Sequence, residues 1–267
     1  MVSTVTVLAI SNQKGGVGKT TTAINVGAAL ANRGQRVLLV DLDPQANATS
    51  GLGASKDSPN AIYGVLLKEQ PITEAIVTTP VEGLHLVPSG PDMAGAEVEL
   101  TPLMAREYRL RQALRGARGY DTVFVDCPPS LGLLTINALA ACDAVLIPVQ
   151  CEYFALEGLA QLLDTIEAVR LRLNDLLEIL AIVLTMEDRR NRLSEQVIDE
   201  VRRHFPKLVT RSRIPRAVRL AEAPSHGLPI SLYDRHSSAA KAYDDLAREL
   251  SARLKSRAPI ALGGAIA

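Results

Sequence analysis

Two kinds of hydrophobic pattern alternate along the chain. Short runs of consecutive apolar residues, rich in Val, Ile and Leu, predict buried β-strands at 5–10, 37–40, 84–87, 123–125, 144–148 and 179–184. Longer stretches with apolar residues every three or four positions predict helices at about 20–32, 106–115, 131–141, 155–173, 194–205 and 237–255. A loop is expected at 51–60, and no internal repeat is present.

This alternation predicts an α/β fold built on a mostly parallel, twisted sheet with helices on both faces. Strands that are apolar along their whole length must be covered on both sides, and parallel neighbours need a right-handed helical crossover. The 267 residues are enough for one large domain, which we expect to span 1–257. Residues 258–267 are apolar but Gly-rich, and we expect a flexible tail there.

A glycine-rich segment joins the first predicted strand to the first predicted helix. It reads Lys14-Gly15-Gly16-Val17-Gly18-Lys19-Thr20-Thr21, and a segment of this kind between a strand and a helix is typical of a phosphate-binding loop. Its glycines allow backbone N–H groups to face phosphate oxygens, and the helix adds the positive end of its dipole. We expect Lys19 to reach the β- and γ-phosphates, the Thr20 hydroxyl to bind Mg²⁺ and Thr21 to contact the α-phosphate.

The loop departs from the common pattern GxxxxGK(S/T), because Gln13 stands at the position of the first glycine and a second lysine, Lys14, lies inside the loop. In this it resembles the deviant Walker A motif of the ParA/MinD family, which are P-loop NTPases of the SIMIBI type. Within that family it is similar to the chromosomal partition ATPases, which implies hydrolysis of ATP with Mg²⁺ as cofactor. The resemblance also implies that Lys14 crosses a homodimer interface to the phosphates of the other subunit, so that hydrolysis depends on dimerisation.

Two acidic motifs follow later strands and resemble the switch regions of the same family. The segment Asp41-Leu42-Asp43-Pro44 ends the strand at 37–40 and is similar to switch I. The resemblance implies that Asp43 positions or activates the attacking water and that Asp41 lies nearer the metal. The segment Asp126-Cys127-Pro128-Pro129 ends the strand at 123–125 and is similar to switch II, which implies that Asp126 holds Mg²⁺ through water.

Two further blocks resemble the nucleotide-binding segments of the family, so that the resemblance extends over nearly the whole chain. The block 148–158 contains Glu152, which the resemblance places at the ribose across the dimer. A surface acid near the start of a helix fits the same position equally well. The block 214–225 begins Ile214-Pro215-Arg216-Ala217, and the resemblance implies that the backbone at Pro215 and Ala217 lines the adenine.

The chain has 29 basic and 29 acidic residues and no formal net charge, so any nucleic acid must be bound by a local patch. The segment 187–219 carries ten basic and five acidic side chains, which is typical of a surface that binds phosphate backbones. By family resemblance, Arg190 and Arg219 bind double-stranded DNA. Aromatic residues make up only 3% of the chain, so we expect contacts to phosphates with little readout of sequence.

The remaining features indicate a cytoplasmic protein. Cys127, Cys142 and Cys151 are odd in number and lack CxxC spacing, so we expect small buried side chains rather than disulfides or a zinc site. The first residues carry no basic segment before the apolar run, and no apolar stretch is long enough to span a bilayer. The helix at 237–255 mixes acidic with basic residues, and we expect no membrane binding through it.

The function predicted from these features is partition of chromosomes or plasmids. ATP binding would produce a sandwich dimer that binds DNA nonspecifically on the nucleoid, and a ParB-type partner would stimulate hydrolysis. Two other functions stay open: a MinD-like ATPase that cycles on a membrane, and a ParA-like scaffold that positions a different cargo. The phosphate loop lies too close to the first residue for a helix-turn-helix domain before it, so we expect no repressor function.

Overall fold

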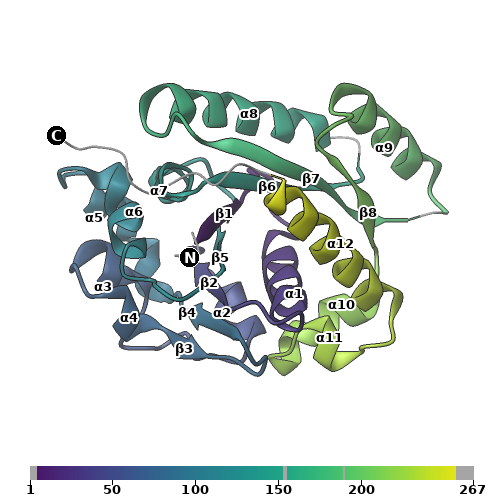
Figure 1. The fold of residues 1–267 in the computed structure, drawn as a ribbon. Helices are drawn as coiled ribbons and strands as arrows, with labels where there is room; N and C mark the ends of the chain where they lie inside the picture. The colour runs from purple at the N-terminus through teal and green to yellow at the C-terminus, as the bar shows by residue number, and fades with distance from the viewer. Residues whose placement is uncertain (1–4, 153–154, 189, 257–267) are drawn as a thin grey trace.

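The computed structural model describes residues 5–152, 155–188 and 190–256. In this part of the chain, eight strands form one sheet in the order β3-β4-β2-β5-β1-β6-β7-β8 (Figure 1). Neighbouring strands are parallel, except that β3 pairs antiparallel with β4. The strands are β1 (Thr6–Ile10), β2 (Val37–Asp41), β3 (Val77–Thr78), β4 (Leu84–Val87), β5 (Thr122–Asp126), β6 (Ala144–Gln150), β7 (Glu178–Glu187) and β8 (Val209–Pro215).

Helices connect the strands and cover both faces of the sheet. The longer helices are α1 (Lys19–Ala31), α7 (Leu133–Ala141), α8 (Ala155–Arg172), α9 (Arg192–His204) and α12 (Ser238–Lys255). The shorter ones are α2 (Asn47–Gly51), α3 (Ile62–Leu67), α4 (Ile72–Ala75), α5 (Ala96–Leu100), α6 (Arg109–Leu114), α10 (Val218–Glu222) and α11 (Ile230–Tyr233). Three 3₁₀ helices complete the set: η1 (Pro91–Ala94), η2 (Arg106–Tyr108) and η3 (Ala223–His226).

The sheet separates two hydrophobic cores, because successive side chains of a strand point to opposite faces. On β1, Leu8 and Ile10 pack in the core that includes α1 and α12. Val7 and Ala9 pack in the other core, with α7, α8 and α9. In Figure 1 α8 and α9 accordingly lie on one side of the sheet and α1 and α12 on the other.

The strands and helices predicted from the hydrophobic pattern are present, with ends that differ by a few residues. The predicted helix at 106–115 is divided into η2 and α6. The edge strand β8 and the short helices α2, α3, α4 and α5 are not predicted by the pattern. The three cysteines are buried and free, as expected, and the predicted tail at 258–267 lies outside the described residues.

The parallel strands end at one edge of the sheet, and each of five neighbouring strands carries polar residues there. Asn12 follows β1, Asp41 ends β2, Asp126 ends β5, Gln150 ends β6 and Thr185 lies near the end of β7. Ligands of open α/β sheets bind outside the carboxyl ends of the strands. This edge is therefore where the predicted site residues meet.

Candidate functional site

The phosphate loop connects β1 to α1, and its shape depends on two glycines. Gly16 and Gly18 have φ angles of +75° and +87°, which residues with a side chain rarely adopt. Asn12 fixes the base of the loop: its amide donates to the Pro148 carbonyl at 2.7 Å, and its side-chain oxygen accepts the Lys14 N–H at 3.0 Å. The loop thus leads directly into the amino end of α1, where free N–H groups and the helix dipole favour an anion.

Lys19 is the first residue of α1, and its side chain folds back over the loop. Its ammonium group donates to the Lys14 carbonyl at 3.1 Å, and the residue is only 6% exposed. Burial lowers the pKa of Lys19, and the carboxylate of Asp126 is the largest influence in the opposite direction. A cation held beside a helix amino terminus and away from solvent fits the predicted contact with the β- and γ-phosphates.

Lys14 and Glu152, which are both predicted to act across a dimer, contact each other in the single chain. The Lys14 ammonium group lies 3.4 Å from one Glu152 oxygen, and the two side chains are 34% and 49% exposed. The Gln150 amide donates to the other Glu152 oxygen at 2.6 Å. Exposed ion pairs of this kind contribute little stability. A phosphate group can therefore replace Glu152 as the partner of Lys14.

Asp41 and Asp126 end the neighbouring strands β2 and β5 and lie opposite each other in the strand register. Both are fully buried. Burial raises the pKa of Asp41 to about 6. Burial and the nearby Asp41 carboxylate raise the pKa of Asp126 well above its usual range. The oxygens of Asp41 are occupied, because one accepts the Asp43 N–H at 3.1 Å and the other accepts the Thr49 N–H and hydroxyl at 2.9 and 2.7 Å.

Asp126 differs from Asp41, because neither of its oxygens has a hydrogen-bond partner among the described residues. The Thr20 hydroxyl lies near Asp126 and favours the charged form of this carboxylate. A buried carboxylate without a partner fits a nearby cation. Thr20 and Asp126 are thus suited to hold Mg²⁺, whereas Asp41 is engaged in the support of switch I.

A magnesium ion at this edge would need ligands beyond the protein. Within the described ranges, no group of three or more His, Cys, Asp or Glu side chains is arranged to hold a metal ion. Mg²⁺ is commonly bound by one or two protein oxygens together with water and substrate phosphates. The chain therefore fits a metal that arrives with the nucleotide.

Asp43 is a third acidic residue of the site and is 7% exposed. One of its carboxylate oxygens accepts the Gln45 N–H at 2.9 Å, and its carbonyl accepts the Ser89 hydroxyl at 2.8 Å. The Ser89 N–H donates in turn to the Thr49 hydroxyl at 2.8 Å. The loop after β4 thus fixes switch I, and the second carboxylate oxygen of Asp43 stays able to accept a hydrogen bond from water, the role predicted for it.

A cavity of about 360 Å³ lies beside the phosphate loop. Gly18 and Thr21 line it from the loop and the start of α1, and Pro215 and Ala217 line it from the end of β8 and the residues after it. Most of its other lining residues are apolar, as is usual for a site that encloses an aromatic base. The structure thus brings the residues predicted for adenine next to those predicted for the phosphates.

Thr185, Met186 and Tyr243 also line this cavity, and no sequence motif predicts them. The Thr185 hydroxyl donates to the Val17 carbonyl of the phosphate loop at 2.8 Å, and Met186 has a positive φ of 54°. Both lie at the carboxyl end of β7, so the rule that ligands bind there could have found them. Tyr243 belongs to α12 and lies 221 residues after its contact Thr22, a separation at which no local pattern gives a signal.

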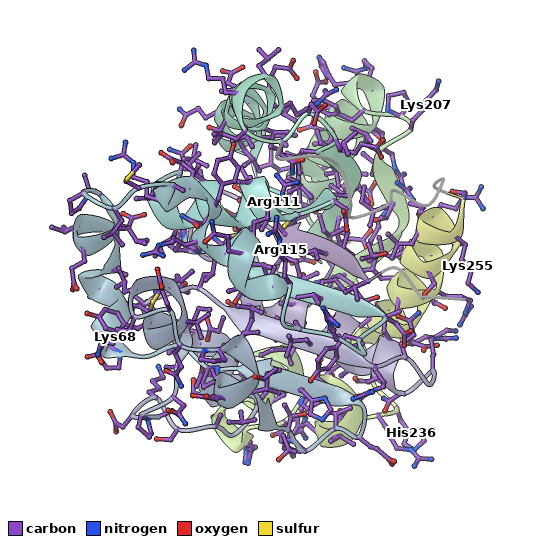
Figure 2. The ribbon with its side chains drawn as sticks, turned by 60° about the vertical axis from the view of Figure 1, so that its left-hand side comes forward. Lys68, Arg111, Arg115, Lys207, His236 and Lys255 are labelled. Carbon is purple, nitrogen blue, oxygen red and sulfur yellow. The ribbon has the colours of Figure 1, made fainter. Side chains whose placement is uncertain are left out.

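The basic segment 187–219 does not form one surface. Because β7 and β8 are parallel, α9 returns from the carboxyl edge of the sheet to its amino edge, a distance of about 20 Å for thirteen residues. Arg192 begins α9, whereas Arg202 lies in its last turn and Lys207 follows it. Lys207 projects away from the molecule in Figure 2. Arg213 pairs with the buried Glu187 at 2.7 Å. The charge count along this segment therefore overstates the patch at either edge, and Arg189 lies outside the described residues.

Arg190 and Arg219 both lie at the carboxyl edge, and each has an acidic partner. The Arg190 side chain is 93% exposed and lies 3.3 Å from Asp188. The Arg219 side chain lies 3.2 Å from Glu222, and its guanidinium group is 5.9 Å from the centre of the Tyr233 ring. The structure thus places the two arginines predicted for DNA at the same edge as the phosphate loop.

The family follows from the relatives of this chain. Residues 5–179 match a family model described as an AAA domain. The sporulation initiation inhibitor protein Soj of Bacillus subtilis is 55% identical over 248 residues, which are 92% of this chain and 98% of that protein. The chain belongs to the Soj/ParA family of chromosome-partitioning ATPases. The chromosome partitioning protein ParA of Caulobacter vibrioides is similar as well, with 54% identity over 255 residues, 94% of this chain and 96% of that protein.

Solved structures agree with the fold of this Soj/ParA ATPase. A structure of cobyrinic acid a,c-diamide synthase from Mycobacterium smegmatis with bound ATP analog and magnesium has a TM-score of 0.83 and 41% identity, and covers 95% of this chain and 97% of that chain. The family, the fold class and the ATPase activity with ATP and Mg²⁺ are thereby confirmed, while the roles of single residues stay predictions. In the part of the chain that the structure describes, no helix is both long and apolar enough to cross a bilayer.

Proposed function

We propose that this Soj/ParA ATPase alternates between a monomer and an ATP-bound sandwich dimer that binds DNA nonspecifically. The observation that carries the proposal is the placement of Lys14. It lies on the phosphate loop with a partly exposed side chain that pairs with Glu152, whereas Lys19 is buried inside the loop. One lysine is thus suited to the phosphates of its own chain and the other to those of a second subunit.

The dimer would bind duplex DNA through its phosphates. Arg190 and Arg219 lie at the carboxyl edge of the sheet in each protomer, so that dimerisation doubles the number of contacts. The exposed Arg192 and Arg216 lie in the same region. Contacts to phosphates alone carry no sequence information, which suits a protein that covers the nucleoid.

Hydrolysis would end the bound state. Asp43 orients the water, Lys14 and Lys19 stabilise the charge that develops on the phosphates, and a ParB-type partner stimulates the step. Residues 1–257 would act as one ATPase unit in this cycle, in the cytoplasm and on the nucleoid. The output is the movement or positioning of chromosome origins.

The deciding measurement is the affinity for duplex DNA with ATP, with ADP and without nucleotide, with dimer formation followed by light scattering. We expect dimers and tight DNA binding with ATP alone. Sedimentation with anionic liposomes tests the MinD-like alternative in the same conditions. Binding to liposomes without binding to DNA would overturn the proposal.

Charge reversal tests the DNA surface. We expect Arg190→Glu and Arg219→Glu to weaken DNA binding, similarly for two unrelated duplexes, and to reduce the slope of log affinity against log salt by roughly one unit per lost contact. Both variants should still dimerise with ATP. Arg115→Glu is the matched control, because Arg115 is exposed and follows α6, on the other side of the molecule from α9 and α10 (Figures 1 and 2). If Arg115→Glu weakened DNA binding by the same amount, the loss would result from the change in net charge and not from lost contacts at Arg190 and Arg219.

A further inference from the structure

Each of the two arginines proposed to bind DNA is held by a carboxylate of its own chain. Arg190 donates to one oxygen of Asp188 twice, from its backbone N–H at 3.1 Å and from its side chain at 3.3 Å. Arg219 donates to Glu222 at 3.2 Å, and the Tyr233 hydroxyl donates to the same Glu222 oxygen at 3.2 Å. Neither arginine is therefore a free cation in the chain that the structure describes.

The two carboxylates lie among the cations of this edge. The backbone N–H and the side chain of Arg190, with a smaller influence of Arg216, hold the pKa of Asp188 below its usual range. Asp188 is 31% exposed and Glu222 is 42% exposed, so both carboxylates lie partly in water. A phosphate that approaches either arginine must therefore approach a carboxylate as well.

We propose that Asp188 and Glu222 limit the DNA affinity of this surface, by occupying Arg190 and Arg219 and by repelling phosphate. The inference rests on the proposed DNA binding. Exposed ion pairs are weak, so phosphate displaces the carboxylates readily. The displaced carboxylate nevertheless stays within a few ångströms of the phosphate, where repulsion through a largely aqueous medium lowers affinity by about three- to fivefold. A dimer that uses both copies would lose about ten- to twentyfold.

A different role for these two carboxylates predicts a change of DNA affinity in the opposite direction. If Asp188 and Glu222 served to orient the arginines for DNA, their neutralisation would weaken binding. Asp188→Asn and Glu222→Gln separate the two roles, because each keeps a side-chain oxygen that can accept the hydrogen bonds from Arg190, Arg219 or Tyr233 but removes the charge. Weak binding that can be reversed quickly suits a protein that must leave DNA after hydrolysis.

The control is a matched ion pair on another element. Glu167 pairs with Arg170 on α8 at 3.2 Å, with the same three-residue spacing and the same distance as Glu222 and Arg219. Glu167→Gln therefore makes the same change in net charge away from the proposed DNA surface. Light scattering with ATP verifies that every variant folds and dimerises.

The experiment measures the affinity of the ATP-bound protein for a duplex between about 50 and 200 mM salt. We expect Asp188→Asn and Glu222→Gln to bind about ten- to twentyfold more tightly than wild type, and Glu167→Gln to change affinity less than about twofold. The double variant Asp188→Asn/Arg190→Ala tests the same point. Its DNA affinity should exceed that of Arg190→Ala by a smaller factor than the one by which Asp188→Asn exceeds wild type, because the arginine that Asp188 shields is absent. If wild type binds DNA but the two variants bind no more tightly than Glu167→Gln, the inference is overturned and the proposed function stands. If wild type with ATP binds no DNA, both the inference and the proposed DNA-binding function are overturned.

Discussion

Asp41 and Asp126 stand side by side at the ends of β2 and β5, fully buried, yet among the residues that the structure describes only Asp41 has hydrogen-bond partners. Thr49 and the backbone of switch I stabilise the first carboxylate. The second lies beside Asp41 and under the electrostatic influence of Lys19, and its oxygens have no hydrogen-bond partner within the described ranges. A buried polar group in this state costs free energy in the absence of a ligand, and functional sites are where such costs occur.

Asp126→Asn should therefore stabilise the nucleotide-free protein, because it removes a buried carboxylate next to another. We expect a gain of about 1–3 kcal/mol in the free energy of unfolding. The same variant should lose the part of the stabilisation by ATP that depends on Mg²⁺. Thermal unfolding with ATP, with and without EDTA, measures both effects. Thr49→Val is the control and should lower the free energy of unfolding, since it removes a hydrogen bond to Asp41. If Asp126→Asn also lowered it, the proposed difference between a satisfied Asp41 and an unsatisfied Asp126 would be wrong.

Lys14→Ala should leave ATP binding intact and prevent dimerisation. Its side chain is partly exposed and its ammonium group pairs with Glu152, while its backbone carbonyl accepts a hydrogen bond from Lys19, so we expect its charge to act mainly on a second subunit. Light scattering with ATP should show a monomer, and a fluorescent ATP analogue should bind with nearly unchanged affinity. Lys19→Ala provides the comparison: it removes the buried cation of the cradle and should abolish nucleotide binding. A stable, hydrolysing Lys14→Ala dimer would exclude a role for Lys14 across the interface.

Asp43→Ala should accumulate the ATP dimer. The change removes the side chain expected to orient water, while the Ser89 contact to the backbone carbonyl of Asp43 is kept. A positioned base or water ligand contributes about 10²–10⁴-fold to rate, so hydrolysis should fall within that range. Phosphate release measured beside dimer formation checks this, and normal turnover would move the role to another residue.

Glu249 gives a stability that depends on pH, because it joins α12 to β8. Its carboxylate accepts the Arg211 and Ser212 N–H groups and pairs with Arg253 at 3.0 Å. Burial by itself raises the pKa of Glu249, but these donors outweigh burial and hold the pKa below its usual range. The contribution is thus complete above the ordinary pKa of a glutamate, about 4.5, and is lost as pH falls through the lower value of the folded state.

Glu249→Gln should accordingly lower the free energy of unfolding by about 1–3 kcal/mol at pH 7. The difference from wild type should shrink below pH of about 4.5. Urea unfolding at several pH values measures this, with Asp245→Asn as a control, since Asp245 forms an exposed pair with Arg248. If the difference in the free energy of unfolding between Glu249→Gln and wild type were the same at every pH, the charge of Glu249 would not explain it.

The central strands of the sheet could be predicted from the sequence, whereas the outermost strand β8 could not. The central strands are apolar throughout, because both faces are buried, and their pattern is plain in the sequence. The edge strand β8 instead has exposed Arg211 and half-buried Arg213 between its apolar residues, so its segment resembles a charge cluster more than a strand. What makes it a strand is pairing with β7 and the ion pair of Arg213 with Glu187.

The sequence alone determined the phosphate loop, the two switch motifs and the family, because each motif needs only a few consecutive residues at the end of a strand. Such residues take their conformation from local backbone preferences and from glycine. Tertiary structure alone decided which charges have partners. It paired Lys14 with Glu152, which follows 138 residues later, and divided the basic segment between two edges of the sheet. It also placed Asp126 beside Asp41 with no hydrogen-bond partner in the part of the chain that the structure describes. These outcomes depend on how distant elements pack, and no local pattern carries that information.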